Sequence, residues 1–120
     1  MPLIVGLWQW PDAMEDAARR LVDAGADMIG INCRPALSVA ARVVRRLARA
    51  VTCPLLVKPG VLPRDVQNDS TPAAFAAALP GLLEYNVRLV GGCCGTTEAH
   101  IAALAAACAV HRNPDKPPDP

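Results

Sequence analysis

Four short apolar segments, each followed by a segment with helical spacing, constrain the fold of this chain most strongly. Continuous apolar runs of this length are typical of parallel strands that are covered on both faces. The strands are expected at residues 3–8, 27–32, 54–58 and 87–91, and the helices at residues 11–24, 36–50, from Thr71 onward, and 98–111. Strands that alternate with helices in this way form a parallel sheet with right-handed crossovers. The chain is therefore predicted to be an α/β protein, a (βα)4 unit.

The length of the chain, 120 residues, is that of one small domain. We expect residues 1–112 to form this domain. Residues 113–120 are rich in proline and polar residues, which predicts a disordered tail. Residues 59–70 form a long polar loop, and loops of that length are usually functional or mobile.

The charge balance and the cysteines limit the partners and the compartment. The net charge of +1 gives no reason to expect a nucleic-acid partner. The apolar run at the N-terminus is too short to span a bilayer and is not followed by a cleavage site, so no membrane association is expected. The five cysteines are an odd number without the spacing of a disulfide scaffold. We therefore expect a cytoplasmic protein whose cysteines stay reduced.

The segment Gly-Gly-Cys-Cys-Gly-Thr-Thr at residues 91–97 follows the last predicted strand. Neighbouring side chains on a strand point to opposite faces, so the backbone must turn if Cys93 and Cys94 serve one site. The flanking glycines permit such a turn. The helix that follows places its positive dipole end near the sulfurs and favours the thiolate form. This pattern predicts part of a metal site, with two buried structural cysteines as the alternative.

Cys33 lies at the end of the second predicted strand, and Cys93 and Cys94 follow the fourth. In a barrel of parallel strands, chemistry gathers at the carboxyl ends, so the three sulfurs are expected at one end of the sheet. Three thiolates with an open fourth position describe a catalytic zinc, although iron and copper(I) remain alternatives. Zinc at such a site lowers the pKa of an incoming thiol, which can then attack an activated methyl group.

Four segments in this order resemble the homocysteine S-methyltransferase family, which includes the homocysteine-binding module of cobalamin-dependent methionine synthase. They are Gly30-Ile31-Asn32-Cys33, Leu56-Val57-Lys58-Pro59, Thr71-Pro72 with Phe75, and the double-cysteine segment followed by His100-Ile101. The resemblance covers nearly the whole chain and corresponds to the second half of the family's eight-unit TIM-type barrel.

The resemblance implies that Cys33, Cys93 and Cys94 are the zinc ligands and that no further catalytic residue is needed. It also implies a methyltransferase whose acceptor is a small-molecule thiol, homocysteine first. The methyl donor would be a corrinoid on a partner protein, a methylated folate, a sulfonium or a betaine. The few aromatic residues give no sign of a cage for a quaternary ammonium, which weighs against betaine. Gly60 stands where the family often has an asparagine.

A four-stranded parallel half-barrel has two open edges and one uncovered face. We expect a partner to cover that face. The simplest partner is a second copy, so that dimerisation completes the barrel with two zinc sites at one rim. A separate chain that supplies the complementary half-barrel is the alternative.

Four further residues are candidates for the surroundings of the metal or for contact with substrate, and they are Asn32, Gly92, His100 and Trp8. Asn32 precedes a proposed ligand and could orient it, or could simply be a turn residue. His100 could support the cysteines or the helix end. Trp8 and Trp10 are expected on one strand face, as packing residues or as a ligand wall.

Two other functions stay open. The chain could be a non-catalytic zinc-binding or assembly subunit that pairs with another half-barrel or a corrinoid protein. It could also be a thiol redox protein that uses Cys93 and Cys94, but a disulfide between adjacent cysteines is strained. Cys53, at the opposite end of its strand, and Cys108, among alanines of the last helix, are expected to be thiols that bind no metal.

Overall fold

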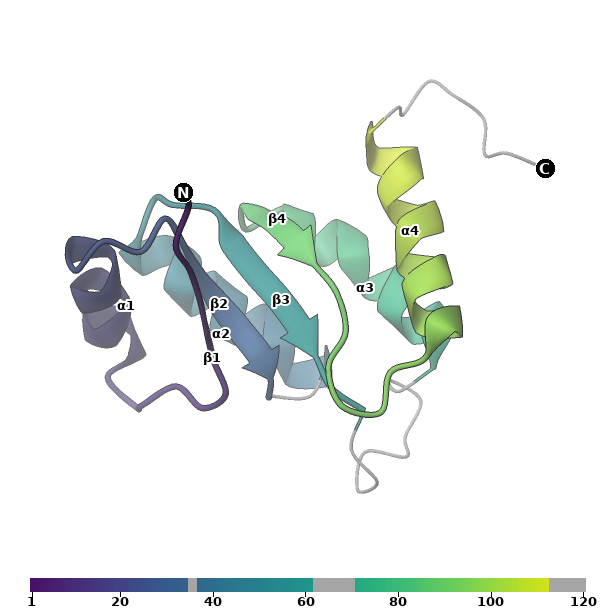
Figure 1. The fold of residues 1–120 in the computed structure, drawn as a ribbon, viewed down its shortest axis with the longest axis horizontal. Coiled ribbons are helices and arrows are strands. Elements are labelled where there is room, and N and C mark those ends of the chain that lie inside the picture. The colour runs from purple at the N-terminus through teal and green to yellow at the C-terminus, as the bar shows by residue number, and fades with distance from the viewer. Residues whose placement is uncertain (35–36, 62–70, 113–120) are drawn as a thin grey trace.

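The computed structural model describes residues 1–34, 37–61 and 71–112. Four strands alternate with four helices along the chain (Figure 1). In order they are β1 (Ile4–Leu7), α1 (Met14–Asp23), β2 (Met28–Cys33), α2 (Leu37–Ala50), β3 (Leu55–Pro59), α3 (Pro72–Leu83), β4 (Val87–Val90) and α4 (Glu98–Arg112). The predicted strands and helices are all present, with ends that differ by a few residues.

The four strands form one parallel sheet in the order β1-β2-β3-β4. This is the strand order of one half of an eight-stranded barrel. The register is continuous except for one irregularity between β3 and β4, at Leu55 and Leu56. All four strands point the same way, so their carboxyl ends lie along one edge of the unit.

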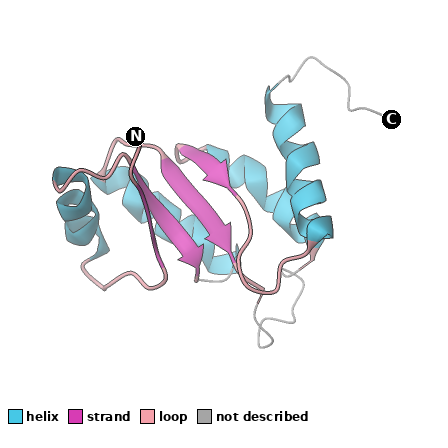
Figure 2. Cartoon of the chain, in the orientation of Figure 1, coloured by secondary structure: helices cyan, strands magenta, loops and turns pink. Residues whose placement is uncertain are grey.

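The helices α1, α2 and α3 lie on one face of this sheet, and the described residues leave the other face uncovered (Figure 2). The core between the sheet and these helices is made of aliphatic side chains. The fully buried strand residues are Ile29, Ile31, Leu55, Val57 and Val87, and they pack against Ala18, Ala40, Val44 and Leu47. Strand residues alternate between the two faces of the sheet. The uncovered face therefore carries the cross-strand row of paired residues Gly6, Gly30, Leu56 and Leu89.

The helix α4 is placed differently from the other three. It packs mainly against α3 rather than against β4, and it stands beside the sheet in Figure 1. The contact between α3 and α4 buries Phe75, Leu79 and Leu104. Every helix in the described part of the chain is too short or too polar to cross a membrane.

Two local expectations differ from the structure. A proline inside a helix is expected to kink or split it, but α3 contains Pro80 and is not split, since it runs from Pro72 to Leu83. The missing N–H of Pro80 removes one hydrogen bond of the helix. The buried side chains of Phe75, Leu79 and Leu82, on both sides of the proline, hold α3 in place. The first strand ends at Leu7, so Trp8 and Trp10 do not share a strand face. The expected tail at residues 113–120 and most of the polar loop lie outside the described residues.

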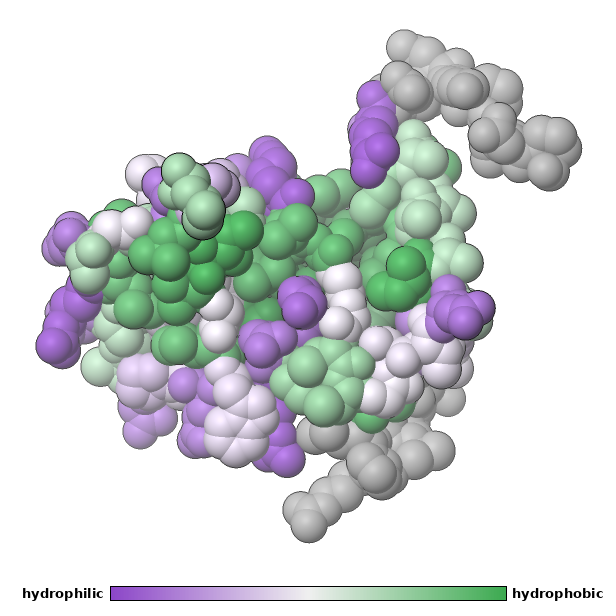
Figure 3. All heavy atoms as spheres, in the orientation of Figure 1, coloured by the Kyte–Doolittle hydropathy of each residue, from purple (hydrophilic) through white to green (hydrophobic). Residues whose placement is uncertain are grey.

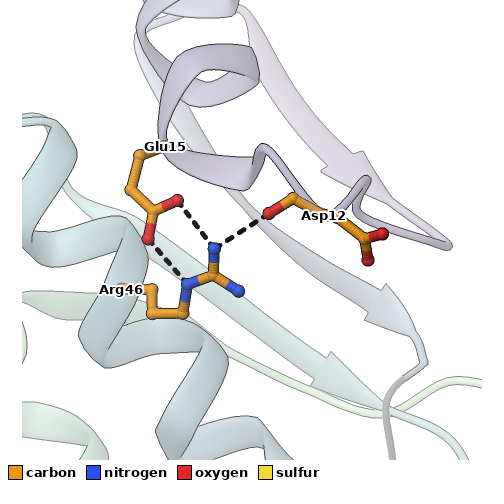
Figure 4. A network of polar contacts seen from close by, with 3 residues as sticks. All are labelled: Asp12, Glu15 and Arg46. Carbon is orange, nitrogen blue, oxygen red and sulfur yellow. Dashed lines mark hydrogen bonds and ion pairs between the residues drawn. The ribbon is translucent and has the colours of Figure 1, made fainter.

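One polar network ties α1 to α2 (Figure 4). The Arg46 guanidinium donates to both carboxylate oxygens of Glu15, at 2.6 and 2.7 Å, and to the backbone carbonyl oxygen of Asp12 at 2.9 Å. The hydrogen bond from Arg46 lowers the pKa of Glu15 from 4.5 to about 2. The pair is partly solvated, so its contribution to stability is small.

This pKa predicts a specific dependence of stability on pH. Because the pKa of Glu15 is lower in the folded state, the ion pair stabilises the fold fully above pH 4.5 and is lost as the pH falls through about 2. The difference in free energy of unfolding between the wild type and Glu15→Gln should therefore shrink over that interval. Urea denaturation at several pH values measures it. In an Arg46→Gln background, which lacks the guanidinium that lowers the pKa of Glu15, the same Glu15→Gln substitution is the control and should show a much weaker trend.

Candidate metal centre

Cys33 ends β2 in an unusual backbone conformation. Its φ is 73°, and the Arg34 N–H donates to the Asn32 carbonyl oxygen at 2.9 Å, which closes a three-residue turn around it. A positive φ is uncommon for a residue other than glycine, and such strained positions cluster at functional sites. The turn ends the strand at Cys33 and fixes its buried thiol at the carboxyl edge of the sheet.

The segment that carries Cys93 and Cys94 is anchored to the end of β3. The Cys93 N–H donates to the Pro59 carbonyl oxygen at 3.1 Å, and the Val61 N–H donates to the Cys94 carbonyl oxygen at 2.6 Å. These two bonds continue the pairing of β3 and β4 beyond the last residue of β4. They hold the two cysteines next to the strand that separates β4 from β2.

Gly60 joins this segment to Cys33. Its N–H donates to the Cys33 carbonyl oxygen at 2.9 Å. A Cβ at this position would lie 2.9 Å from Cys33 Sγ and 3.2 Å from the Cys94 carbonyl oxygen. The asparagine expected from family resemblance would not fit here unless Cys33 or Cys94 moved, so the absence of a side chain lets the two cysteine-bearing segments approach each other.

The turn between the two adjacent cysteines and α4 depends on two contacts. Thr96 donates to the Cys93 carbonyl oxygen twice, from its N–H at 3.2 Å and from its Oγ1 at 2.7 Å. Gly95 has a φ of 78° and its Cα faces the Val61 carbonyl closely, so a side chain there is excluded. Gly92 packs against the Thr96 side chain and likewise leaves no room for a Cβ. The predicted sharp turn is therefore present.

Together these contacts bring the sulfurs of Cys33, Cys93 and Cys94 within 4.8 Å of one another. Three thiolates around a tetrahedral zinc lie about 3.8 Å apart, given Zn–S distances of about 2.3 Å. The cluster therefore fits a metal ion after small movements of the sulfurs. Cys33 is buried, Cys93 is half-buried and Cys94 is exposed, so the cluster opens to solvent on one side.

His100 lies at the start of α4 and supports that helix end. Its Nδ1 accepts from the Thr97 N–H at 3.1 Å and lies 3.0 Å from Thr97 Oγ1. This is the reciprocal contact of an N-terminal capping box, with histidine in the place of the usual glutamate. The ring also packs edge-to-face on Phe75, with centroids 4.9 Å apart. Of the two roles considered for His100, these contacts favour support of the helix.

Asn32 and Trp8 flank Cys33 without joining the sulfur cluster. The Oδ1 atom of Asn32 is buried and has no hydrogen-bond partner in the described structure, which is costly unless a bound group supplies one. Trp8 is exposed, and the Arg34 guanidinium stacks 5.2 Å above its ring. Trp10 instead packs against the core and donates from its indole nitrogen to the Gly30 carbonyl oxygen at 3.0 Å.

The two remaining cysteines lie away from the cluster. Cys53 precedes β3 at the amino edge of the sheet, and burial raises the pKa of its thiol. Cys108 lies in α4 beside Leu79 and Val87. Neither belongs to a group of side chains that could hold a metal within the described residues.

The residues that sequence reasoning missed are those that hold the cluster together. Pro59, Gly60, Val61 and Thr96 act mainly through backbone groups, which carry no signature in a sequence. In the sequence, the run Lys58-Pro59-Gly60 stands out only through the family resemblance. Its position directly after a predicted strand was the available signal that its backbone faces the carboxyl edge.

Known proteins resemble this chain over most of its length. The methionine synthase of Mycobacterium tuberculosis (strain ATCC 25618 / H37Rv) is 39% identical over 98 residues, which are 77% of this chain and 8% of that protein. The methionine synthase of Mycobacterium leprae (strain TN) is 38% identical over 91 residues, 71% of this chain and 8% of that protein. The chain thus spans a small part of these relatives.

Solved structures also resemble this chain, and they agree with the fold described above. The apo form of the homocysteine methyltransferase MmuM from Escherichia coli superposes with a TM-score of 0.63 and 32% identity over 78% of this chain and 32% of that chain. The metallated form of the same protein gives a TM-score of 0.63 and 33% identity over 78% of this chain and 28% of that chain. These neighbours are TIM barrels, and the four strand–helix units described here form a half-barrel of that type. Residues 11–108 match the family described as homocysteine S-methyltransferase, and the chain belongs to that family.

Proposed function

We propose that this half-barrel is the zinc-binding part of a methyltransferase, in which Cys33, Cys93 and Cys94 bind Zn²⁺ and a thiol acceptor, homocysteine, is methylated. The observation that carries the proposal is the convergence of the three sulfurs to within 4.8 Å at the carboxyl edge of a parallel sheet. Family membership supports the transfer of a methyl group. Homocysteine as acceptor is proposed because the solved neighbours are homocysteine methyltransferases.

The donor set favours zinc over other metals. Thiolates are soft ligands, and three of them with one open position match catalytic zinc sites. A solved neighbour is described in a metallated form, which supports a metal in a protein of this fold. All five cysteines of the chain are free, and a reducing cytoplasm would keep the ligands available.

When bound, zinc would lower the pKa of a thiol at its fourth position and so make a thiolate available at neutral pH. The chain's own residues set where that thiol can bind. Cys33 closes the inner side of the cluster, and exposed Cys94 leaves the solvent side open for the acceptor. Thr96 and Pro59 hold the backbone of Cys93, which keeps the open side in place. In the transfer, the sulfur–methyl bond forms, the bond between the donor and the methyl group breaks, and the thiol proton passes to solvent.

The methyl donor is proposed to be a corrinoid or a methylated folate, since the curated relatives are methionine synthases. Methionine would then be the product. The chain covers 8% of those relatives, so the donor is expected to reach this half-barrel from another domain or chain.

Zinc content tests the ligand set. The purified protein should hold about one zinc per chain, and Cys33→Ala, Cys93→Ala and Cys94→Ala should each lose most of it, because two thiolates bind zinc far more weakly than three. Elemental analysis together with protein quantification measures this ratio. Cys53→Ala and Cys108→Ala are matched controls and should retain the metal. Equal zinc in all five variants would exclude this centre.

X-ray absorption at the zinc edge tests the acceptor. Without added thiol it should show three sulfur neighbours and one lighter atom, and with homocysteine it should show four sulfurs. Serine, which offers a hydroxyl, should leave the spectrum unchanged. Four sulfurs without methyl transfer from any offered donor would favour the non-catalytic zinc-binding subunit. No change with homocysteine would refute thiol activation.

The close approach of Gly60 to Cys33 predicts that a side chain at residue 60 weakens metal binding. Gly60→Ala places a methyl group 2.9 Å from Cys33 Sγ, so the sulfur must move and the affinity for zinc should fall by about 10–100-fold. Competition with a chelator of known affinity measures the change. Gly81→Ala, in an exposed part of α3 with no atom near the new methyl, should bind zinc like the wild type.

A further inference from the structure

Large apolar side chains are exposed at the two ends of the unit. Among the described residues they come from the N-terminal segment with β1, from the turn after β1, from β4 and from α4, and they are Met1, Leu3, Ile4, Trp8, Leu89, Ile101 and Val110. The inner elements β2, α2, β3 and α3 contribute none, and neither does α1. Figure 3 shows hydrophobic side chains gathered over the β1 side of the open sheet face and along α4. Contiguous exposed apolar surface of this kind marks an interaction site.

The helix α4 has an uncovered apolar face. Ten consecutive residues, 101–110, are apolar, and helices that are apolar all round are normally buried. In this chain α4 buries only His100 and Leu104, against α3. The opposite face carries Ile101, Ala105 and Ala109, all exposed. Its small side chains make a flat surface that a neighbouring element can approach closely.

The other end of the unit, beside β1, carries a hollow that is lined mainly by apolar side chains, like the exposed side of α4. It has a volume of about 400 Å³ between the end of β1 and α1, and it is lined by Leu7, Pro11, Ala17, Arg20 and Leu21. In a (βα)8 barrel each helix packs between its own strand and the next strand. The hollow beside β1 is therefore the place of the helix that would precede β1 in a closed ring, and α4 is followed by no strand among the described residues.

Exposed charges lie at the amino edge of the sheet at both ends of the unit. Arg88 at the start of β4 and Arg112 at the end of α4 are exposed, and the aspartates nearest to β1 at the same edge, Asp23 and Asp27, are also exposed. The only ion pair among the described residues is the one between Arg46 and Glu15, so these four charges form none with one another. In a closed parallel ring the amino edge of β4 lies beside the amino edge of β1, which brings the two arginines toward Asp23 and Asp27 and also toward the exposed Arg20 of α1.

We propose that two copies of this chain close an eight-stranded barrel by docking β4 and α4 of each copy on β1 and α1 of the other. Both strands at the edges of the sheet are parallel and each is paired on one side only, so a two-fold axis along the barrel makes all eight strands parallel. A second copy is the occupant because the complementary surfaces belong to the same chain and two copies satisfy both ends at once. The barrel then carries two cysteine clusters at one rim, and this assembly does not depend on their binding metal.

Native mass spectrometry and light scattering of the full chain test the assembly. The expected mass is twice that of one chain. A stable single chain, open-ended larger assemblies, or a defined complex that forms only with a different half-barrel chain would each overturn the proposal.

A substitution on α4 tests the interface. Ala105→Arg puts a long cation on the exposed apolar face, opposite the hollow that contains Arg20, and should convert the dimer into single chains. Ala77→Arg, at an exposed position of α3 that faces solvent, is the matched control and should remain dimeric. Circular dichroism of both variants checks that the helices are retained. A dimer of unchanged affinity in Ala105→Arg would show that the copies meet elsewhere, for instance face to face through their sheets.

Discussion

The hydrogen bonds at the end of β3 are the constraint on which the candidate centre depends. Three consecutive residues of this segment form backbone hydrogen bonds to the two segments that carry the cysteines. Pro59 accepts from Cys93, Gly60 donates to Cys33, and Val61 donates to Cys94. Because β3 lies between β2 and β4, it is the one strand that can reach both. The parallel sheet therefore fixes the main chain around the cluster, and the main chain in turn fixes the positions of the three thiols.

The positions of the cysteines could be predicted from the sequence because they follow from two strong patterns. Apolar runs located the strands, and the rule that parallel strands share a carboxyl edge brought Cys33 to the side of Cys93 and Cys94. The details of approach could not be predicted, since the positive φ of Cys33 and the contact of Gly60 with its sulfur arise from tertiary packing. The continuous α3 helix shows the same limit, because a local proline signal at Pro80 was outweighed by the packing of Phe75, Leu79 and Leu82.

The two tryptophans show how an alternating pattern can mislead at the end of a strand. Period-two spacing put Trp8 and Trp10 on one face, but β1 stops at Leu7 and the chain then turns toward α1. Trp10 turns inward and binds the Gly30 carbonyl, whereas Trp8 stays exposed under Arg34. Side chains beyond the last paired residue are placed by the loop, so the alternation that holds within β1 no longer applies to them.

The cysteine cluster and the closure of a barrel are separate requirements on the same sheet. Every contact that positions the three sulfurs comes from β2, β3 and the segment after β4, so the centre can form within one half-barrel. The uncovered face and the exposed side of α4 require a partner surface, because their apolar side chains stabilise the fold only when another unit removes them from water. A half-barrel can therefore keep the geometry of its three clustered cysteines while its stability, and the walls around the open side of the cluster, depend on what completes the barrel.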